Sequence, residues 1–204
     1  MIKNILFDLG GVLVDLDVHA SIRKMAELLP NTDEAPITWK DLIGGGETKL
    51  VQQYQTGKIT TDDFVQTILA ACRPTTTREQ IVDAWFAMLR TIPEQRLAMI
   101  RRLKEAGLHI YILSNINELH VDWVKQHYPE LLALCDKAFF SNEIQIAKPD
   151  LAAYEYVLSH ADIKADETLY IDDLGANITA GQAAGFVSIQ AIGDEWLTHT
   201  EKLL

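Results

Sequence analysis

The side chains best suited to chemistry in this chain each follow a short apolar segment. They are Asp8 after residues 5–7, Ser114 and Asn115 after residues 111–113, Lys148 beyond residues 138–140, and Asp172 with Asp173 after residues 169–171. Apolar segments of this length, ended by polar residues, are typical of buried strands. The carboxyl ends of parallel strands meet at one edge of a sheet, where ligands bind. A single Ser-Asn or Asp-Asp pair commonly belongs to an ordinary turn, but four such sites in order predict one shared crevice.

Three carboxylates are expected in this crevice. Asp8, Asp172 and Asp173 would repel one another strongly unless a cation lay among them. Mg²⁺ prefers oxygen ligands and often bridges to a substrate phosphate. With negative charge neutralised in this way, Asp8 is able to attack phosphorus in line and form an aspartyl-phosphate. The carboxylates therefore predict Mg²⁺-dependent phosphoryl transfer.

The remaining residues at the strand ends suit the binding of a phosphate group. Lys148 would neutralise its charge, and Ser114 and Asn115, with neighbouring backbone N–H groups, would hold its non-bridging oxygens. Gly10 and Gly11 follow Asp8 directly, and residues without a side chain let the backbone approach a bound group closely. We therefore expect Ser114, Asn115, Lys148 and Gly10 around the phosphate.

Helices and strands alternate through the second half of the chain. Helices are predicted over residues 93–107, 117–127, 150–160 and 175–184, and strands over residues 108–113, 138–140, 168–171 and 186–190. Pro93 and Asn117 are typical helix starts, and Gly107 is a typical helix end. Helices that alternate with short apolar strands predict an α/β fold, in which helices cover both faces of a doubly wound parallel sheet.

Residues 15–90 interrupt this pattern directly after the first strand. Helical periodicity occurs over residues 18–29, 47–55, 62–72 and from Thr77 onward, which predicts a small helical bundle. Residues 1–14 and 91–204 would then form the α/β core. An insertion at this point lies over the ligand-binding edge of the sheet and can act as a lid. Trp39 and the glycines at 44–46 are candidates for contact with the substrate.

Composition limits the partners and the compartment. The formal net charge is −11, from 18 Lys and Arg against 29 Asp and Glu, which argues against nucleic acid or an anionic membrane surface as a partner. A small phosphorylated metabolite is the expected partner of a monomer or a homodimer. No signal peptide or membrane-spanning apolar stretch is visible, so a cytoplasmic location is expected. Cys72 and Cys135 lack metal-ligand spacing and are interpreted as free thiols.

Four motifs give a resemblance to a known family. Residues 7–13 (FDLGGVL), 113–115 (LSN), 148–150 (KPD) and 170–178 (YIDDLGANI) resemble, in order and spacing, the motifs of the haloacid dehalogenase-like (HAD) hydrolase superfamily. The resemblance covers nearly the whole chain. It implies a Rossmann-like sheet with strand order 5-4-1-2-3 and a helical cap of the first type after strand 1. Residues 113–120 and 128–130 are more narrowly similar to bacterial α-D-glucose-1-phosphate phosphatases, and residues 171–177 to the phosphatase domain of soluble epoxide hydrolases.

The resemblance also implies a role for each site residue. Asp8 is the nucleophile, and Asp8, Asp173 and the main-chain carbonyl of Gly10 bind Mg²⁺. Asp172 supports the metal through its water shell, and Lys148 orients and neutralises the reacting groups. The implied function is a Mg²⁺-dependent phosphatase that hydrolyses a small phosphorylated metabolite, with a sugar phosphate such as glucose 1-phosphate as the expected substrate.

The chain departs from the family pattern at one position. Most phosphatases of the superfamily carry a second Asp two residues after the nucleophile, where this chain has Gly10. Loss of this general acid and base is expected to lower the rate by about 10²–10⁴-fold, although a sugar 1-phosphate has a less basic leaving oxygen. Asp15, Asp17 and His19 lie close in sequence, but helix capping is the favoured interpretation for them. His120 follows the second strand and is a weaker candidate.

Other functions remain open at this point. Haloacid dehalogenases of the superfamily also lack the second Asp and carry Ser-Asn after the second strand. Their chemistry needs no metal, so the acidic pair Asp172–Asp173 favours the phosphatase. A catalytically weak protein that binds a metabolite or a partner is a second alternative, but it would gain nothing from a nucleophile bridged to a metal. A phosphomutase is a third, and the absence of an acid–base residue at Gly10 argues against it.

Overall fold

The computed structural model describes residues 1–30 and 50–204. Trp39, residues 44–46 and the first part of the helix predicted over residues 47–55 lie outside the described residues. Among the described residues, none of the helices is both long enough and apolar enough to cross a membrane.

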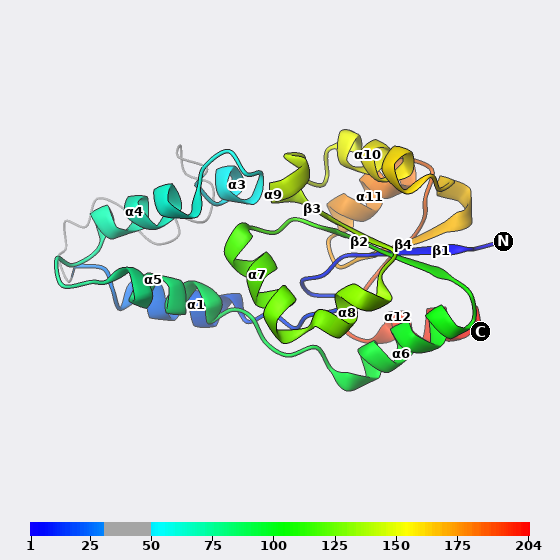
Figure 1. The fold of residues 1–204 in the computed structure, drawn as a ribbon, viewed down its shortest axis with the longest axis horizontal. Coiled ribbons are helices and arrows are strands. Elements are labelled where there is room, and N and C mark those ends of the chain that lie inside the picture. The colour runs from blue at the N-terminus through cyan, green and yellow to red at the C-terminus, as the bar shows by residue number, and fades with distance from the viewer. Residues whose placement is uncertain (31–49) are drawn as a thin grey trace.

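Five parallel strands form one sheet (Figure 1). The strands are β1 (Asn4–Phe7), β2 (His109–Ser114), β3 (Lys137–Phe140), β4 (Thr168–Asp172) and β5 (Val187–Gln190), in the order β3-β2-β1-β4-β5. This order confirms the predicted 5-4-1-2-3 arrangement. Phe7 pairs with Ile112 on one side and with Ile171 on the other, so the carboxyl ends of β1, β2 and β4 lie side by side. The polar residues that follow these strands are therefore neighbours.

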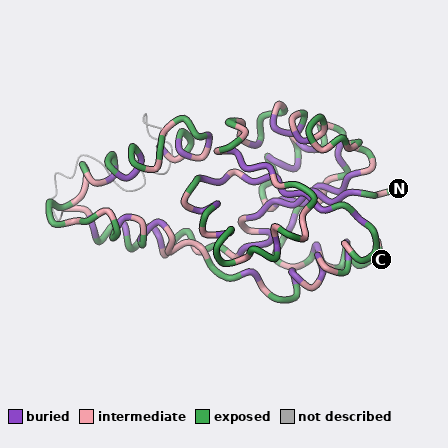
Figure 2. Tube along the Cα trace, viewed as in Figure 1, coloured by how far each residue is buried: buried purple, intermediate pink, exposed green. Residues whose placement is uncertain are grey.

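Helices cover both faces of the sheet, and two apolar clusters fill the space between the layers (Figures 1 and 2). The helices after the insertion are α6 (Glu94–Glu105), α7 (Glu118–His127), α8 (Pro129–Leu134), α9 (Ser141–Ile144), α10 (Leu151–Ala161), α11 (Gly175–Ala183) and α12 (Glu195–Glu201). Ile5 and Phe7 pack toward α6 and α12, whereas Leu6 packs toward α10 and α11. Because successive side chains of a strand alternate in direction, β1 is buried on both faces.

Several helices begin where the sequence predicts a cap. Thr60 and Thr77 each accept a hydrogen bond from the residue three positions on and complete a capping box, which starts α4 (Thr61–Ala71) and α5 (Arg78–Phe86). Asn117 accepts from the His120 backbone N–H at the start of α7. The Asp150 side chain caps α10 by accepting from the Ala152 backbone N–H, so local capping chemistry fixes four of the helix boundaries.

Helices α1 (Val18–Ala26), α3 (Leu50–Gln55), α4 and α5 enclose a third apolar cluster, separate from the two at the sheet. Tyr54 stacks on Phe64 with ring centroids 4.3 Å apart, and Phe64 contacts Trp85 at 5.0 Å. Residues 15–17 and 88–91 pair through backbone hydrogen bonds where this helical unit joins the sheet. The N–H of Asp17 donates to the Met88 carbonyl at 2.8 Å, and the N–H of Arg90 donates to the Asp15 carbonyl at 2.9 Å. We propose on this basis that residues 15–90 form a cap domain.

Candidate active site

A buried ion-pair network joins the ends of β1 and β4. Lys148 Nζ lies 2.9 Å from Asp8 Oδ1 and 2.6 Å from Asp172 Oδ2. All three residues are buried, with exposed fractions of 4% for Lys148, 8% for Asp8 and 0% for Asp172. Hydrogen-bonded ion pairs of this kind are held more rigidly than surface pairs, because water does not compete for the charges. Lys148 therefore fixes the position of the Asp8 carboxylate.

Asp172 is surrounded by donors from the protein itself. The Tyr170 hydroxyl donates to Oδ2 at 2.6 Å, and Asn177 Nδ2 donates to Oδ1 at 2.9 Å. The Leu174 backbone N–H also donates to Oδ1, at 2.9 Å. Together with Lys148, these bonds occupy both carboxylate oxygens. The structure thus favours a supporting role for Asp172 over direct coordination of a metal ion.

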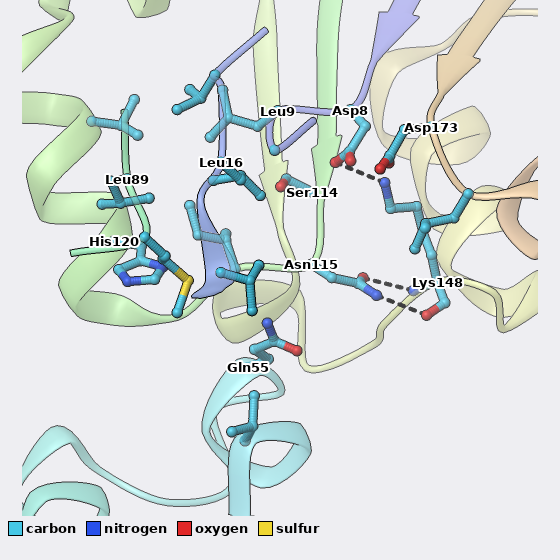
Figure 3. Close-up of a pocket in the computed structure, with 18 of the residues that line it drawn as sticks. Asp8, Leu9, Leu16, Gln55, Leu89, Ser114, Asn115, His120, Lys148 and Asp173 are labelled. Carbon is cyan, nitrogen blue, oxygen red and sulfur yellow. Dashed lines mark hydrogen bonds and ion pairs between the residues drawn. The ribbon is translucent and has the colours of Figure 1, made fainter. Parts of the chain in front are cut away.

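The Asn115 side chain holds the main chain of Lys148. Its Nδ2 donates to the Lys148 carbonyl at 2.8 Å, and its Oδ1 accepts from the Lys148 backbone N–H at 2.8 Å. Both polar atoms of the amide are used in this clamp (Figure 3). Asn115 therefore positions Lys148, and the direct phosphate contact expected of this side chain stays a prediction, since the amide nitrogen has a second N–H.

The donor set at these strand ends fits a small hard cation. Asp8, Asp172 and Asp173 each place one carboxylate oxygen within 4.8 Å of the others. Gly11 has φ +81°, and a Cβ built on it would come within 2.6 Å of Asp173 Oδ2, so only glycine permits this close approach. Since the oxygens of Asp172 are already paired, Asp8 and Asp173 supply the free carboxylate oxygens that would hold Mg²⁺.

The pKa values of the cluster reflect an excess of negative charge. Burial raises the pKa of Asp8 from 3.8 to about 6, against the opposing effect of the Lys148 ammonium. Burial and the neighbouring Asp172 charge also raise the pKa of Asp173. Burial opposes the charge of Lys148, but the two carboxylates beside it outweigh that effect and raise its pKa. One ammonium group does not balance three carboxylates, and a bound cation would relieve the difference.

A cavity of about 450 Å³ opens over these residues (Figure 3). Asp8, Gly10, Ser114, Lys148 and Asp173 line it on the side of the sheet. Ser114 is 3% exposed, at the end of β2, and lines the cavity together with Asp8. The structure thus brings together the sequence-predicted residues of three separate strands in one cavity.

The place of the missing second Asp is next to an apolar side chain. A Cβ built on Gly10 would lie 2.9 Å from Leu16 Cδ1. Asp15 is held in an ion pair with Arg96 at 2.8 Å. Asp17 caps α1 through the Ala20 backbone N–H, at 2.9 Å. Neither residue lines the cavity, and the same is true of His19, so the capping interpretation holds for Asp17.

Sequence reasoning did not identify Tyr170, Asn177 and Leu16 as parts of this site. A signal existed for Tyr170, because residues two apart in a strand project from the same face and Asp172 is two positions on. Asn177 and Leu16 had no comparable local signal. Their positions depend on the first turn of α11 and on the pairing of residues 15–17 with residues 88–91.

Comparison with known proteins agrees with this geometry. A family model described as haloacid dehalogenase-like hydrolase matches residues 2–185. A D-ribitol-5-phosphate phosphatase of Bacteroides thetaiotaomicron is 29% identical over 203 residues, which cover 96% of this chain and 95% of the relative. A sesquiterpene phosphatase of Aspergillus oryzae is 29% identical over 205 residues, which cover 92% and 88%.

A solved structure of a HAD family enzyme from Bacteroides thetaiotaomicron, in complex with magnesium and inorganic phosphate, is also similar. It superposes with a TM-score of 0.83 at 30% identity, over 96% of this chain and 98% of that chain. The family model spans most of the residues, and the structural similarity extends through both the sheet and the inserted helices. The chain therefore belongs to the haloacid dehalogenase-like hydrolase family.

Proposed function

We propose that this protein is a Mg²⁺-dependent phosphatase that hydrolyses a small phosphorylated compound through an aspartyl-phosphate on Asp8. The observation that carries the proposal is the position of Asp8 at the floor of the cavity, where Lys148 holds it and Asp173 lies close by. The phosphatase activity of the relatives and the magnesium and phosphate bound to the similar structure support it.

The first step is attack by an Asp8 carboxylate oxygen on phosphorus. A pKa of about 6 leaves most of the Asp8 carboxyl ionised at neutral pH, so the nucleophile is present in its reactive form. The P–O ester bond breaks, and its electron pair goes to the leaving oxygen. Bound Mg²⁺ would neutralise charge between the phosphate and the carboxylates, while Lys148 keeps the Asp8 carboxylate oriented and stays protonated.

The second step regenerates Asp8. A water molecule attacks the phosphorus of the aspartyl-phosphate, and the bond between phosphorus and the Asp8 oxygen breaks to release inorganic phosphate. Ser114 and Gly10 line the cavity, so Ser114 would donate to a phosphate oxygen in both steps and the backbone around Gly10 would approach the same group. The acidic residues that would hold Mg²⁺ favour this reaction over dehalogenation, whose chemistry needs no metal.

Neither step has a general acid or base at the usual position. Among the described residues that line the cavity, the titratable ones are Asp8, His120, Lys148 and Asp173, and none of them occupies the place beside Gly10. The leaving oxygen must therefore depart with little help, which favours esters of weakly basic alcohols. Glucose 1-phosphate, the substrate expected from sequence, and aryl phosphates both meet this condition.

Phosphate release from an aryl phosphate and from glucose 1-phosphate, each with Mg²⁺ and with EDTA, tests the proposal. The wild type should release phosphate only with the metal, and Asp8→Asn should release none. Asp83→Asn replaces an exposed carboxylate on α5 and serves as the matched control with full activity. Metal-independent release, or equal release by Asp8→Asn, would refute the mechanism. A 2-haloacid in the same series tests the dehalogenase alternative.

A further inference from the structure

Among the described residues, the part of the cavity wall away from the strand ends is mostly apolar. The cap, its linkers and α7 supply seven apolar lining side chains: Leu16, Val18, Val51, Trp85, Met88, Leu89 and Val124. Figure 3 shows Leu89 on the side of the cavity away from Asp8 and Lys148, with Leu16 between Leu89 and Ser114. Ligand sites of this size commonly combine a few polar groups with an apolar lining.

Leu16 is the apolar side chain next to the turn of the nucleophile. Its Cδ1 approaches the place of a Gly10 Cβ to 2.9 Å, and the backbone of Leu16 pairs with that of Leu89 in an isolated antiparallel bridge. Leu16 nevertheless stays 41% exposed. A large apolar side chain that remains open beside a reacting group is available to contact a ligand. It would meet the atoms of the substrate that follow the ester oxygen.

In the part of the chain that the structure describes, this wall has two polar members, Gln55 and His120. They are few partners for a polyhydroxylated group, although His120 Nε2 is buried without a hydrogen-bond partner. The His120 ring stacks on Trp85 with centroids 5.2 Å apart, and its Nδ1 lies 3.2 Å from Asn117 Nδ2. Burial lowers the pKa of His120 to about 4, although the Trp85 carbonyl opposes this slightly, so the ring is neutral at neutral pH. Buried hydroxyl groups without partners weaken binding.

We propose that the organic group of the substrate is chiefly apolar and that Leu16 is a specificity-determining residue that contacts it. The proposal rests on the proposed phosphatase function. It assigns apolar phosphomonoesters as the substrate class, where the sequence predicts a sugar phosphate. The relatives include both a D-ribitol-5-phosphate phosphatase and a sesquiterpene phosphatase, each 29% identical to this chain, over 96% and 92% of its residues. The lining of the cavity is the evidence that favours the apolar class.

Binding of non-hydrolysable phosphonates tests this inference without turnover. Calorimetric titration of the wild type with methylphosphonate and hexylphosphonate, in the presence of Mg²⁺, measures how much the organic chain adds to the affinity. Burial of the additional methylene groups should make hexylphosphonate bind at least about tenfold more tightly. Equal affinities for the two phosphonates would overturn the proposal.

Two variants test the contribution of Leu16. Leu16→Asn keeps a similar size but introduces a polar amide, so the ratio of the two phosphonate affinities should fall toward one. Leu151→Asn is the matched control, because Leu151 is 45% exposed on α10 and does not line the cavity. It should keep the wild-type ratio. An unchanged ratio in Leu16→Asn would refute the role assigned to this residue.

Turnover separates this inference from the proposed function. Hexyl phosphate should be hydrolysed with a higher kcat/KM than glucose 1-phosphate, and Leu16→Asn should reduce that preference. A preference for glucose 1-phosphate would overturn the apolar assignment and support the phosphatase mechanism. Failure to release phosphate from either ester or from an aryl phosphate, with the hexylphosphonate preference intact, would refute the phosphatase mechanism and support the apolar assignment.

Discussion

Replacement of Asp8 by Asn is expected to abolish activity and, in the absence of metal, to stabilise the fold. Asp8 is almost fully buried, and burial raises the pKa of its carboxyl even though Lys148 lies 2.9 Å away. The folded state therefore disfavours the ionised carboxylate, which is the form that the reaction needs. Asn has nearly the same shape and carries no charge, so it removes this penalty.

The magnitude follows from the pKa of Asp8, which rises from 3.8 to about 6. A tenfold change in proton affinity corresponds to about 1.4 kcal/mol, so at neutral pH the ionised carboxylate lowers the free energy of unfolding by about 3 kcal/mol. Below pH 3.8 the carboxyl is protonated in both the folded and the unfolded chain, and the penalty is absent. The penalty grows as the pH rises from 3.8 and is fully present above about 6.

Urea unfolding in EDTA, followed by tryptophan fluorescence, measures this effect. Asp8→Asn should be more stable than the wild type by up to about 3 kcal/mol at neutral pH, and the two proteins should converge near the acid end of the range. Asp83→Asn, the exposed control, should match the wild type throughout. A less stable Asp8→Asn variant at neutral pH would show that Lys148 outweighs burial and would refute this reasoning.

Three further substitutions probe the site. Lys148→Met should destabilise the metal-free protein by about 3–5 kcal/mol in urea unfolding, because it leaves buried carboxylates unpaired. A decrease in the free energy of unfolding of less than about 1 kcal/mol, which is about fivefold in the folding equilibrium, would argue against the ion-pair network. Gly11→Ala should weaken Mg²⁺ binding in calorimetric titration, because the new Cβ meets Asp173 Oδ2 at 2.6 Å in a backbone conformation with φ +81°; unchanged affinity would separate Asp173 from the metal. Gly10→Asp should raise kcat for alkyl phosphates by about 10²-fold or more and for aryl phosphates far less, once the flexible Leu16 side chain moves aside; an equal effect on both esters would exclude leaving-group protonation.

The sequence was sufficient to predict the sheet and the residues at its carboxyl edge. Short apolar segments such as residues 5–7 and 169–171 are strong signals because both faces of the sheet are covered. The capped starts of α4, α5 and α7 were also predictable, since Thr60, Thr77 and Asn117 act within one turn of the chain.

The elements that were not predicted depend on distant contacts. Helix α12 is short, and its burial comes from Trp196, whose ring meets Phe7 of the first strand at 5.2 Å. Helices α8 and α9 have six and four residues, too few for a clear helical period.

The roles of individual site residues were likewise only partly predictable. The side chain of Asn115 clamps the main chain of Lys148, which is 33 positions away in sequence, and this role was not predicted. Leu16 occupies space beside Gly10 because two linkers of the cap pair with each other. Such contacts arise from the tertiary fold, and no local pattern in the sequence encodes them.

Direct detection of the aspartyl-phosphate tests the central claim about Asp8. The wild type would be mixed with an aryl phosphate and Mg²⁺, quenched in acid at successive times, digested and examined by mass spectrometry. Because Gly10 provides no base to activate water, the intermediate should accumulate, and the peptide that contains Asp8 should gain the mass of one phosphoryl group with Mg²⁺ but not with EDTA. Metal-dependent phosphate release with no phosphorylation of that peptide at any time would contradict the account.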